Sequence, residues 1–261
     1  MTIIKHELKA GRNSLIIWAT IIAFMMGLCV LIYPQMGSQM TEISGMFANM
    51  GSFSAAFGMD KINFGEFSGF FAVECGNVLG LGGAFFAALL GISALSKEEK
   101  EHTAEFFLTH PVSRAAVVFD KLCAAVVQLI LLNLAVAGVT ALSVLIIGEK
   151  PDVYNLFLLF LAYFIMQLET CAICFGVSAF INSNSAGIGL GSAALFYFIN
   201  IVANLTEKAE FLKFITPFGY TDGADIISSG KIELKYLVVG FIFTAIGIAA
   251  AFYKYNKKDI A

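Results

Sequence analysis

Long runs of apolar residues, separated by short polar interruptions, dominate the pattern along this chain. A helix needs about 20 apolar residues to cross the hydrocarbon core of a bilayer, because each residue adds about 1.5 Å. The pattern predicts six membrane-spanning helices, at residues 15–33, 73–95, 116–147, 153–181, 186–205 and 234–255. The predicted fold is therefore an all-α polytopic membrane protein, with residues 1–261 forming a single transmembrane domain.

The connections between the predicted spans differ in length. Gly148, Lys150 and Pro151 break the third run from the fourth, and both of these runs are longer than a bilayer requires, so we expect them to tilt or project into water. Two long connections, residues 34–72 and 206–233, are too polar to span. We expect both to form helices that lie at the outer interface or dip into it.

Composition supports a membrane rather than an aqueous environment. Hydrophobic residues make up 59% of the chain and charged residues 13%, whereas soluble domains carry about 25% charged residues. The net charge of −3 argues against a nucleic-acid partner. The five cysteines lie in apolar surroundings and are predicted to be packing residues, including the C-x-x-C pair Cys171 and Cys174.

The distribution of basic residues predicts the orientation in the membrane. An even number of spans places both termini on one side, and that side holds ten lysine and arginine residues against six on the other. We therefore expect both termini in the cytoplasm. The basic residues assigned to the cytoplasmic side are Lys5, Lys9, Arg12, Lys97, Lys100, Arg114, Lys121, Lys254, Lys257 and Lys258.

The segment of residues 96–114, between the second and third spans, is the one strongly charged cluster in the interior of the chain. Ser96 followed by Glu99 matches a capping box, which predicts that a helix begins or restarts there. Acidic residues recur on one face of that helix and apolar residues on the other. Pro111 ends the helix, and Ser113 can cap the third span.

Such a short amphipathic helix has two main uses at this turn. It can present a face to a soluble partner, or it can pack as a turn within its own chain. An acidic face would be repelled by an anionic inner leaflet, which counts against a role on the lipid surface. The residue pattern alone leaves the two main alternatives open.

The same segment resembles the signature of ABC-2-type permeases, which are six-span subunits of ABC exporters. That signature reads approximately E-x-E-x-G-T-x-E-x-L-L-x-x-P-V-S-R and is followed by G-K. The matching residues are Glu99, Glu101, Thr103, Glu105, Phe107, Leu108, Pro111, Val112, Ser113 and Arg114. The departures are His102 in place of glycine, a Phe106-Phe107 pair where leucines are common, and Asp120 before Lys121.

Two further elements extend the resemblance over nearly the whole chain. Residues 212–222, with the sequence LKFITPFGYTD, look like the family's L-x-x-L-T-P-F-x-Y-x-D element between the last two spans. Residues 255–260 look like its closing tail.

The resemblance implies a function in transport. The segment of residues 96–114 would be a coupling helix docked on a separate ATPase subunit, and residues about 3–12 would form an amphipathic elbow helix on the membrane surface. Two permease chains would pair as a homodimer or heterodimer in the bacterial cell membrane. The chain contains no G-x-x-x-x-G-K-[ST] loop, so ATP and Mg²⁺ would be bound by the partner, and this chain would be a non-catalytic subunit without a cofactor.

The resemblance also assigns candidate contacts. Glu99, Glu101, Thr103, Glu105, Phe107, Leu108 and Pro111 are expected at the ATPase interface, and Arg114 is expected to anchor the turn. The alternative for Arg114 is an internal ion pair with Glu105.

Ionisable and amide side chains within the predicted spans are candidates for a substrate pathway, because such groups usually face the interior of a bundle. These candidates are Glu169, Gln167 and Asn133. The alternative is that they form hydrogen bonds that join helices. Glycines in the second and fifth spans permit close helix contacts, either within one chain or between two chains.

A stand-alone secondary transporter or channel is the competing function. It would require several intramembrane charges and paired broken helices, and this chain has one deep carboxylate and no inverted repeat that we can identify.

Overall fold

The computed structural model of the protein describes residues 2–48, 51–56, 58–59, 61–63, 65–96, 113–181 and 186–257. Every regular element within these residues is a helix, and six helices among them are long and apolar enough to cross a membrane. The prediction of an all-α fold with six spans is therefore confirmed. The six candidate spans are Ile3–Met36, Phe67–Ala94, Arg114–Ile147, Val153–Ser178, Ala186–Leu205 and Leu234–Lys257.

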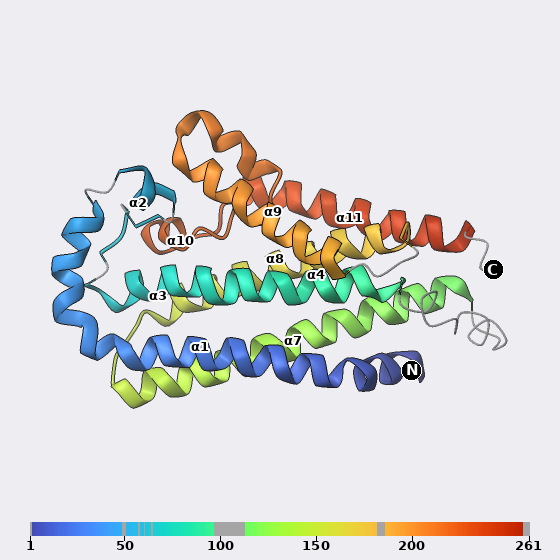
Figure 1. The fold of residues 1–261 in the computed structure, drawn as a ribbon, viewed down its shortest axis with the longest axis horizontal. Coiled ribbons are helices and arrows are strands. Elements are labelled where there is room, and N and C mark those ends of the chain that lie inside the picture. The colour runs from blue at the N-terminus through green and yellow to red at the C-terminus, as the bar shows by residue number, and fades with distance from the viewer. Residues whose placement is uncertain are drawn as a thin grey trace.

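Helix α1 (Thr2–Ala48) contains both the expected elbow and the first span. The start of α1 packs on the bundle, because Gly11 lacks a side chain and leaves room for Gln128 of the third span, and because Ile3 is buried. The elbow is therefore the beginning of α1 and not a separate helix. Pro34 lies inside α1, and the helix turns away from the bundle in this part of the chain (Figure 1).

The second span is built from three helical pieces in succession. These are α3 (Phe67–Cys75), the π-helix η1 (Gly76–Leu81) and α4 (Gly82–Ala94). The helix begins at Phe67, before the apolar run expected from Val73, because Phe67 and Phe70 pack on Tyr33 of α1 with ring centroids 5.2 and 5.3 Å away. A π-helical turn inside an α-helix is rare and is often found at functional sites.

The third and fourth spans, α7 (Arg114–Ile147) and α8 (Val153–Ser178), begin at side-chain caps. The hydroxyl of Ser113 accepts a hydrogen bond from the backbone N–H of Ala116 at 3.2 Å, which confirms the predicted cap. Gly148 ends α7 with a φ of 74°. The Asp152 carboxylate then accepts from the N–H of Tyr154 at 2.9 Å and starts α8.

The last part of the chain contains two spans and two short helices between them. Helix α9 (Ala186–Leu205) is followed by the 3-10 helix η2 (Glu207–Phe214), α10 (Gly223–Ser229) and α11 (Leu234–Lys257). The first long connection holds the end of α1 and the short helix α2 (Ser52–Ala56). The helical character expected of both connections is confirmed.

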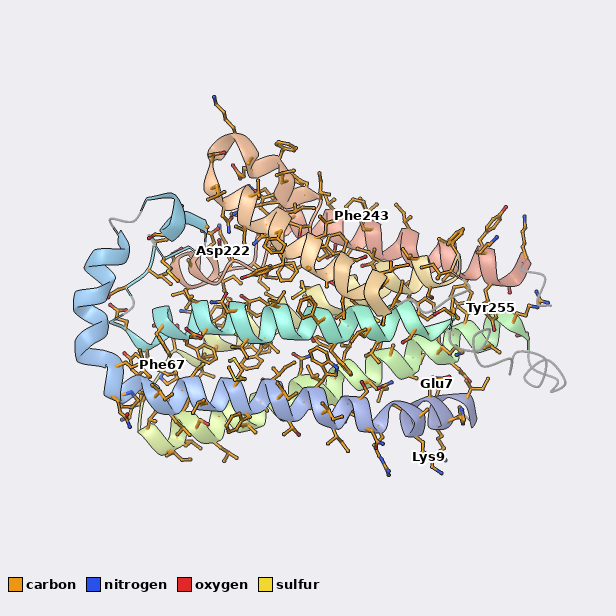
Figure 2. The ribbon with its side chains drawn as sticks, in the orientation of Figure 1. Glu7, Lys9, Phe67, Asp222, Phe243 and Tyr255 are labelled. Carbon is orange, nitrogen blue, oxygen red and sulfur yellow. The ribbon has the colours of Figure 1, made fainter. Side chains whose placement is uncertain are left out.

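The start of α1, the start of α7 and the end of α11 lie at one end of the bundle, which we call the base (Figure 1). Helices α2 and α10 lie at the opposite end, which we call the apex (Figure 1). Side chains of α1, the second span and α7 fill the space between these helices (Figure 2). The buried core gathers large side chains that include Met26, Phe71, Phe86, Leu129 and Leu159.

Glycines let α4 and α8 approach closely. A methyl group at Gly83 would overlap the Gln167 side chain, and one at Gly91 would overlap the carbonyl of Cys171. The sequence left open whether the glycines make close contacts within one chain or between two chains. Gly83 and Gly91 make them within the chain. Gly187 and Gly191 of α9 have no atom within 4 Å of an added methyl group, so they lie on an open face.

Candidate functional site

The predicted ATPase contacts fall mostly outside the described residues. Glu99, Glu101, Thr103, Glu105, Phe107, Leu108 and Pro111 all belong to residues 97–112, which the structure does not describe. Their roles stay predictions. The described flanks of this segment are Ser96, just after α4, and Ser113, which caps α7.

Lys121 ties three helices together at the base. Its side chain is 2% exposed, and its ammonium group donates to the carbonyl oxygen of Ala94 at 2.7 Å and to the Glu7 carboxylate at 3.1 Å. These contacts join the start of α7 to the end of α4 and the start of α1. The sequence showed Lys121 only as a basic residue near the G-K position, because nothing in its local pattern indicates a buried ammonium group.

Arg114, predicted to anchor the turn, is the first residue of α7. Its guanidinium donates to the carbonyl oxygen of Asn256 near the end of α11 at 3.4 Å. A cluster of buried apolar side chains at the base joins the ends of α1, α4, α7, α8 and α11. Its members are Ile3, Leu95, Val117, Val118, Phe175, Ala179, Ala251 and Tyr255. The residues that flank 97–112 therefore pack in a cluster where the ends of five helices meet.

Glu169 lies deep in α8 and is 4% exposed. Its carboxylate accepts a hydrogen bond from the Tyr220 hydroxyl at 2.8 Å. On the other side it lies against Gly240 of α11, where any side chain would overlap the carboxylate. The carboxylate therefore connects α8 to α11 and to the chain between α9 and α10.

Gln167 and Asn133 lie against each other. The amide nitrogen of Asn133 donates to the Gln167 side-chain oxygen at 2.6 Å and to the carbonyl of Leu129 at 2.9 Å. The remaining amide atoms, Oδ1 of Asn133 and Nε2 of Gln167, are buried and have no hydrogen-bond partner among the described residues. The pair joins α7 to α8, as the helix-joining alternative expects, and its place in a substrate pathway stays a prediction.

Residues 215–222, which we call the inserted segment, enter the apical half of the bundle. Residues 216–221 are all buried. The Thr216 hydroxyl donates to the Phe196 carbonyl of α9 at 2.8 Å, and the Tyr163 hydroxyl of α8 donates to the Thr221 carbonyl at 2.9 Å. With the bond from Tyr220 to Glu169, these contacts hold the segment between α8 and α9.

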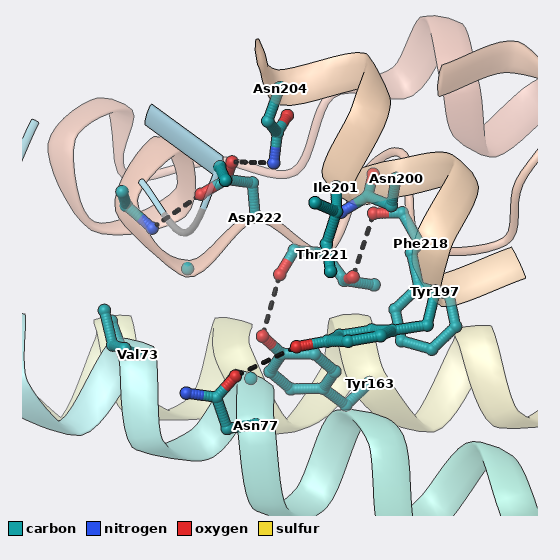
Figure 3. A pocket seen from close by; sticks show the side chains of 15 residues that line it. Val73, Asn77, Tyr163, Tyr197, Asn200, Ile201, Asn204, Phe218, Thr221 and Asp222 are labelled. Carbon is teal, nitrogen blue, oxygen red and sulfur yellow. Dashed lines mark hydrogen bonds between the residues drawn. The ribbon is translucent and has the colours of Figure 1, made fainter. Parts of the chain in front are cut away.

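The inserted segment forms one wall of a small polar cavity of about 60 Å³ at the apex. Asn77, on the π-helical turn, accepts a hydrogen bond from the Tyr197 hydroxyl at 3.1 Å on one side of it. On the other side, Asp222 and Asn204 lie together, with the amide of Asn204 donating to the carboxylate at 3.2 Å (Figure 3). The sequence placed Asp222 at the end of the LKFITPFGYTD element, but it did not predict this cavity, because the cavity is formed by segments far apart in the chain.

Burial shifts the acid–base behaviour of the inserted segment. It raises the pKa of the Asp222 carboxyl, and the nearby Asp225 carboxylate acts in the same direction, whereas Lys213 and Lys61 oppose it. Burial also raises the pKa of the Tyr220 phenol well above its ordinary value. Both shifts favour the neutral form of a group in an apolar setting.

A second cavity of about 300 Å³ lies at the base between α1, α4 and α7. Its lining combines apolar side chains such as Phe86 and Leu90 with polar ones such as Glu7, Lys121 and Gln128. Within the described residues no group of three or more histidine, cysteine, aspartate or glutamate side chains could hold a metal ion. All five cysteines are free thiols.

Among the described residues, six helices that are long and apolar enough to cross a membrane define the class of this chain as a multi-pass membrane protein. The family model described as ABC-2 family transporter protein matches residues 1–260, so the chain belongs to this family. It is thus a membrane permease component of an ABC transporter, a non-catalytic transmembrane subunit whose family implies an ATPase partner. No curated protein matches the chain.

Proposed function

We propose that this chain forms the substrate pathway of an ATP-driven exporter and that a separate ATPase drives it by docking on residues 96–114. In this proposal two permease chains pair in a bacterial cytoplasmic membrane, and the base of the bundle lies in the cytoplasm. Membership of the ABC-2 family over residues 1–260 supports an ATPase partner. The excess of lysine and arginine on the loops and termini at the base supports the orientation.

The observation that carries the proposal is the set of hydrogen bonds that join the helix ends at the base. Arg114 bonds to the end of α11, and Lys121 bonds to the end of α4 and the start of α1. A partner that pushed on residues 96–114 would therefore move four helices together, because these contacts join them and the two made by Lys121 are partly buried. Such rigid-body motion is how packed helices convert a local displacement into a change of global state.

The inserted segment supports a second part of the proposal. It closes the apical half of the bundle in this structure, with residues 216–221 buried and tied to α8 and α9. For cargo to leave at the apex, these contacts must loosen. We place Glu169 at the inner edge of this closure, where its carboxylate would meet a cargo that moves along α8.

The test is co-expression of this chain with its candidate ATPase partner, followed by co-purification. In the triple variant Glu101→Ala, Glu105→Ala and Phe107→Ala, the amount of ATPase retained by a tagged permease should fall at least about tenfold, because interface residues of this kind carry a large share of binding energy. A matched control removes similar groups at the apex through Glu66→Ala, Glu149→Ala and Val153→Ala, and it should retain the ATPase.

Thermal unfolding of both triple variants shows whether they are folded. If the first variant is folded and still retains the ATPase with undiminished hydrolysis, the docking proposal is wrong.

A further inference from the structure

The apical cavity beside Asp222 has buried hydrogen-bond acceptors without a donor in the part of the chain that the structure describes. The side-chain oxygens of Asn200 and Asn204 are buried and have no hydrogen-bond partner among the described residues. Both residues and Asp222 line the cavity. A buried polar atom without a partner costs about 1–3 kcal/mol, so the cavity is incomplete without a group that these oxygens can bind.

Three hydroxyl donors near the cavity are already engaged. The Tyr163 hydroxyl donates to the Thr221 carbonyl, and the Tyr197 hydroxyl donates to Asn77. The Thr221 hydroxyl donates to the Phe218 carbonyl at 2.9 Å. These three hydroxyls are therefore not available to the side-chain oxygens of Asn200 and Asn204, which a cation or an N–H or O–H group from outside the chain could satisfy.

The Asp222 carboxylate adds a negative charge to these oxygens. It accepts N–H groups from Asn204 and from the backbone of Ala224, at 3.2 and 3.0 Å. The nearest lysines pair with the next carboxylate along the chain, because Lys61 and Lys213 lie 2.7 and 3.5 Å from Asp225. Among the described residues Asp222 has no direct ion pair, so its ionised form would leave a negative charge in the cavity for a cation to balance.

We propose that this cavity binds one small monovalent cation through the Asp222 carboxylate and the side-chain oxygens of Asn200 and Asn204. A cavity of about 60 Å³ has room for one small ion and excludes large organic cations. Calcium and magnesium sites generally use several carboxylates or many oxygens, whereas one carboxylate lines this cavity. An alkali-metal ion and the ammonium head of a small amine share the required chemistry.

Binding would fix the inserted segment in place. Asp222 ends that segment and caps α10, while Asn200 and Asn204 lie on α9. A cation held between them joins the two elements more firmly than the single bond from Asn204 does. The inference concerns a site that the proposed transport function does not require, so it stands or falls independently of ATPase docking.

Thermal unfolding of the purified full-length chain in detergent tests the proposal, with dye labelling of the buried cysteines as the signal. Sodium, potassium, ammonium and methylammonium chloride are each compared with N-methyl-D-glucamine chloride at equal ionic strength. At least one small cation should raise the unfolding midpoint, by about 3 °C for each tenfold increase above its dissociation constant. A shift with sodium or potassium identifies an alkali-metal site, and a shift only with ammonium or methylammonium identifies an amine site.

The decisive variant is Asp222→Asn. Asparagine also caps helices well, and its amide can donate to Asn204 Oδ1, which has no partner in the wild-type chain. The variant should therefore be at least as stable as the wild type in N-methyl-D-glucamine and should lose the cation shift. Asp152→Asn is the matched control, because Asp152 also caps a helix by accepting an N–H two residues along, and it should keep the shift.

A second variant, Asn200→Ala, removes one proposed ligand and should raise the cation concentration needed for half of the shift. The proposal is overturned if no small cation differs from N-methyl-D-glucamine, which would mean that the cavity holds only water. It is equally overturned if Asp222→Asn or Asn200→Ala shows the full wild-type shift, which would mean that the ions act on the protein generally.

Discussion

At the scale of single residues, the contact between Tyr220 and Glu169 shows how a buried acid is accommodated in the bundle. Both side chains are nearly inaccessible, at 3% and 4% exposed. The phenol donates one hydrogen bond to the carboxylate at 2.8 Å. Because polar groups inside a membrane protein are costly without partners, this bond is a substantial part of what holds the inserted segment.

Removing the Tyr220 hydroxyl tests this interpretation. Tyr220→Phe should lower stability by about 1–3 kcal/mol, because the Glu169 carboxylate loses the hydrogen bond it accepts. The loss is measured as a decrease in the thermal unfolding midpoint in detergent. Tyr253→Phe is the control, since Tyr253 is 64% exposed, and it should have little effect. An unchanged midpoint for Tyr220→Phe would show that the bond is not needed for stability.

At the scale of helices, glycines set which spans pack closely. A methyl group at Gly91 would overlap the backbone carbonyl of Cys171, and one at Gly176 would lie 2.6 Å from the carbonyl of Gly247. Backbone atoms of a packed helix cannot move aside as a flexible side chain can. The close pairs formed by α8 with α4 and with α11 therefore depend on these positions.

A pair of alanine substitutions separates packing from helix propensity. Gly91→Ala should destabilise the protein by about 1–3 kcal/mol, because overpacking forces the two helices apart. Gly138→Ala introduces the same methyl group on α7 with no atom within 4 Å, so it should be neutral or stabilising by up to about 1 kcal/mol. Comparison of the two unfolding midpoints checks the prediction, and equal shifts would contradict it.

How far the sequence predicts the elements depends on whether the signal is local. The Ser113 cap and the break at Gly148 follow from neighbouring residues, and both are confirmed. The six spans follow from apolar runs. The bond from Tyr220 to Glu169 joins residues 51 positions apart, and no local pattern indicates that a tyrosine in a polar connection reaches into a span.

The beginning of α1 illustrates a different difficulty. Residues 3–12 have the amphipathic pattern of a surface helix, and the same pattern also suits a helix that packs one face on the bundle. Gly11 and Gln128 decide between the two arrangements through a contact across more than a hundred residues. The cavity at Asp222 was missed for the same reason, because its lining comes from five separate stretches of chain.

At the scale of the whole molecule, the bundle has two ends with different chemistry. The base gathers the start of α1, the end of α11, the flanks of residues 97–112 and the partly buried ion pair of Lys121 with Glu7. The apex contains the inserted segment and the cavity at Asp222. The proposed function, with an ATPase at the base and a closure at the apex, requires that the base face the cytoplasm, where ATP is available.

Labelling of single cysteines tests this orientation directly. Ser113 at the base and Lys150 at the apex are both exposed, so each can be changed to cysteine in a background where Cys29 and Cys123 are alanine and the other three thiols remain buried. In intact cells, a membrane-impermeant maleimide should label Lys150→Cys and should label Ser113→Cys only after permeabilisation. The opposite pattern would put residues 96–114 outside the cell, beyond the reach of a cytoplasmic ATPase, and would refute both the orientation and the docking proposal. The cation site at Asp222 would remain testable, because its ligands all lie within the chain.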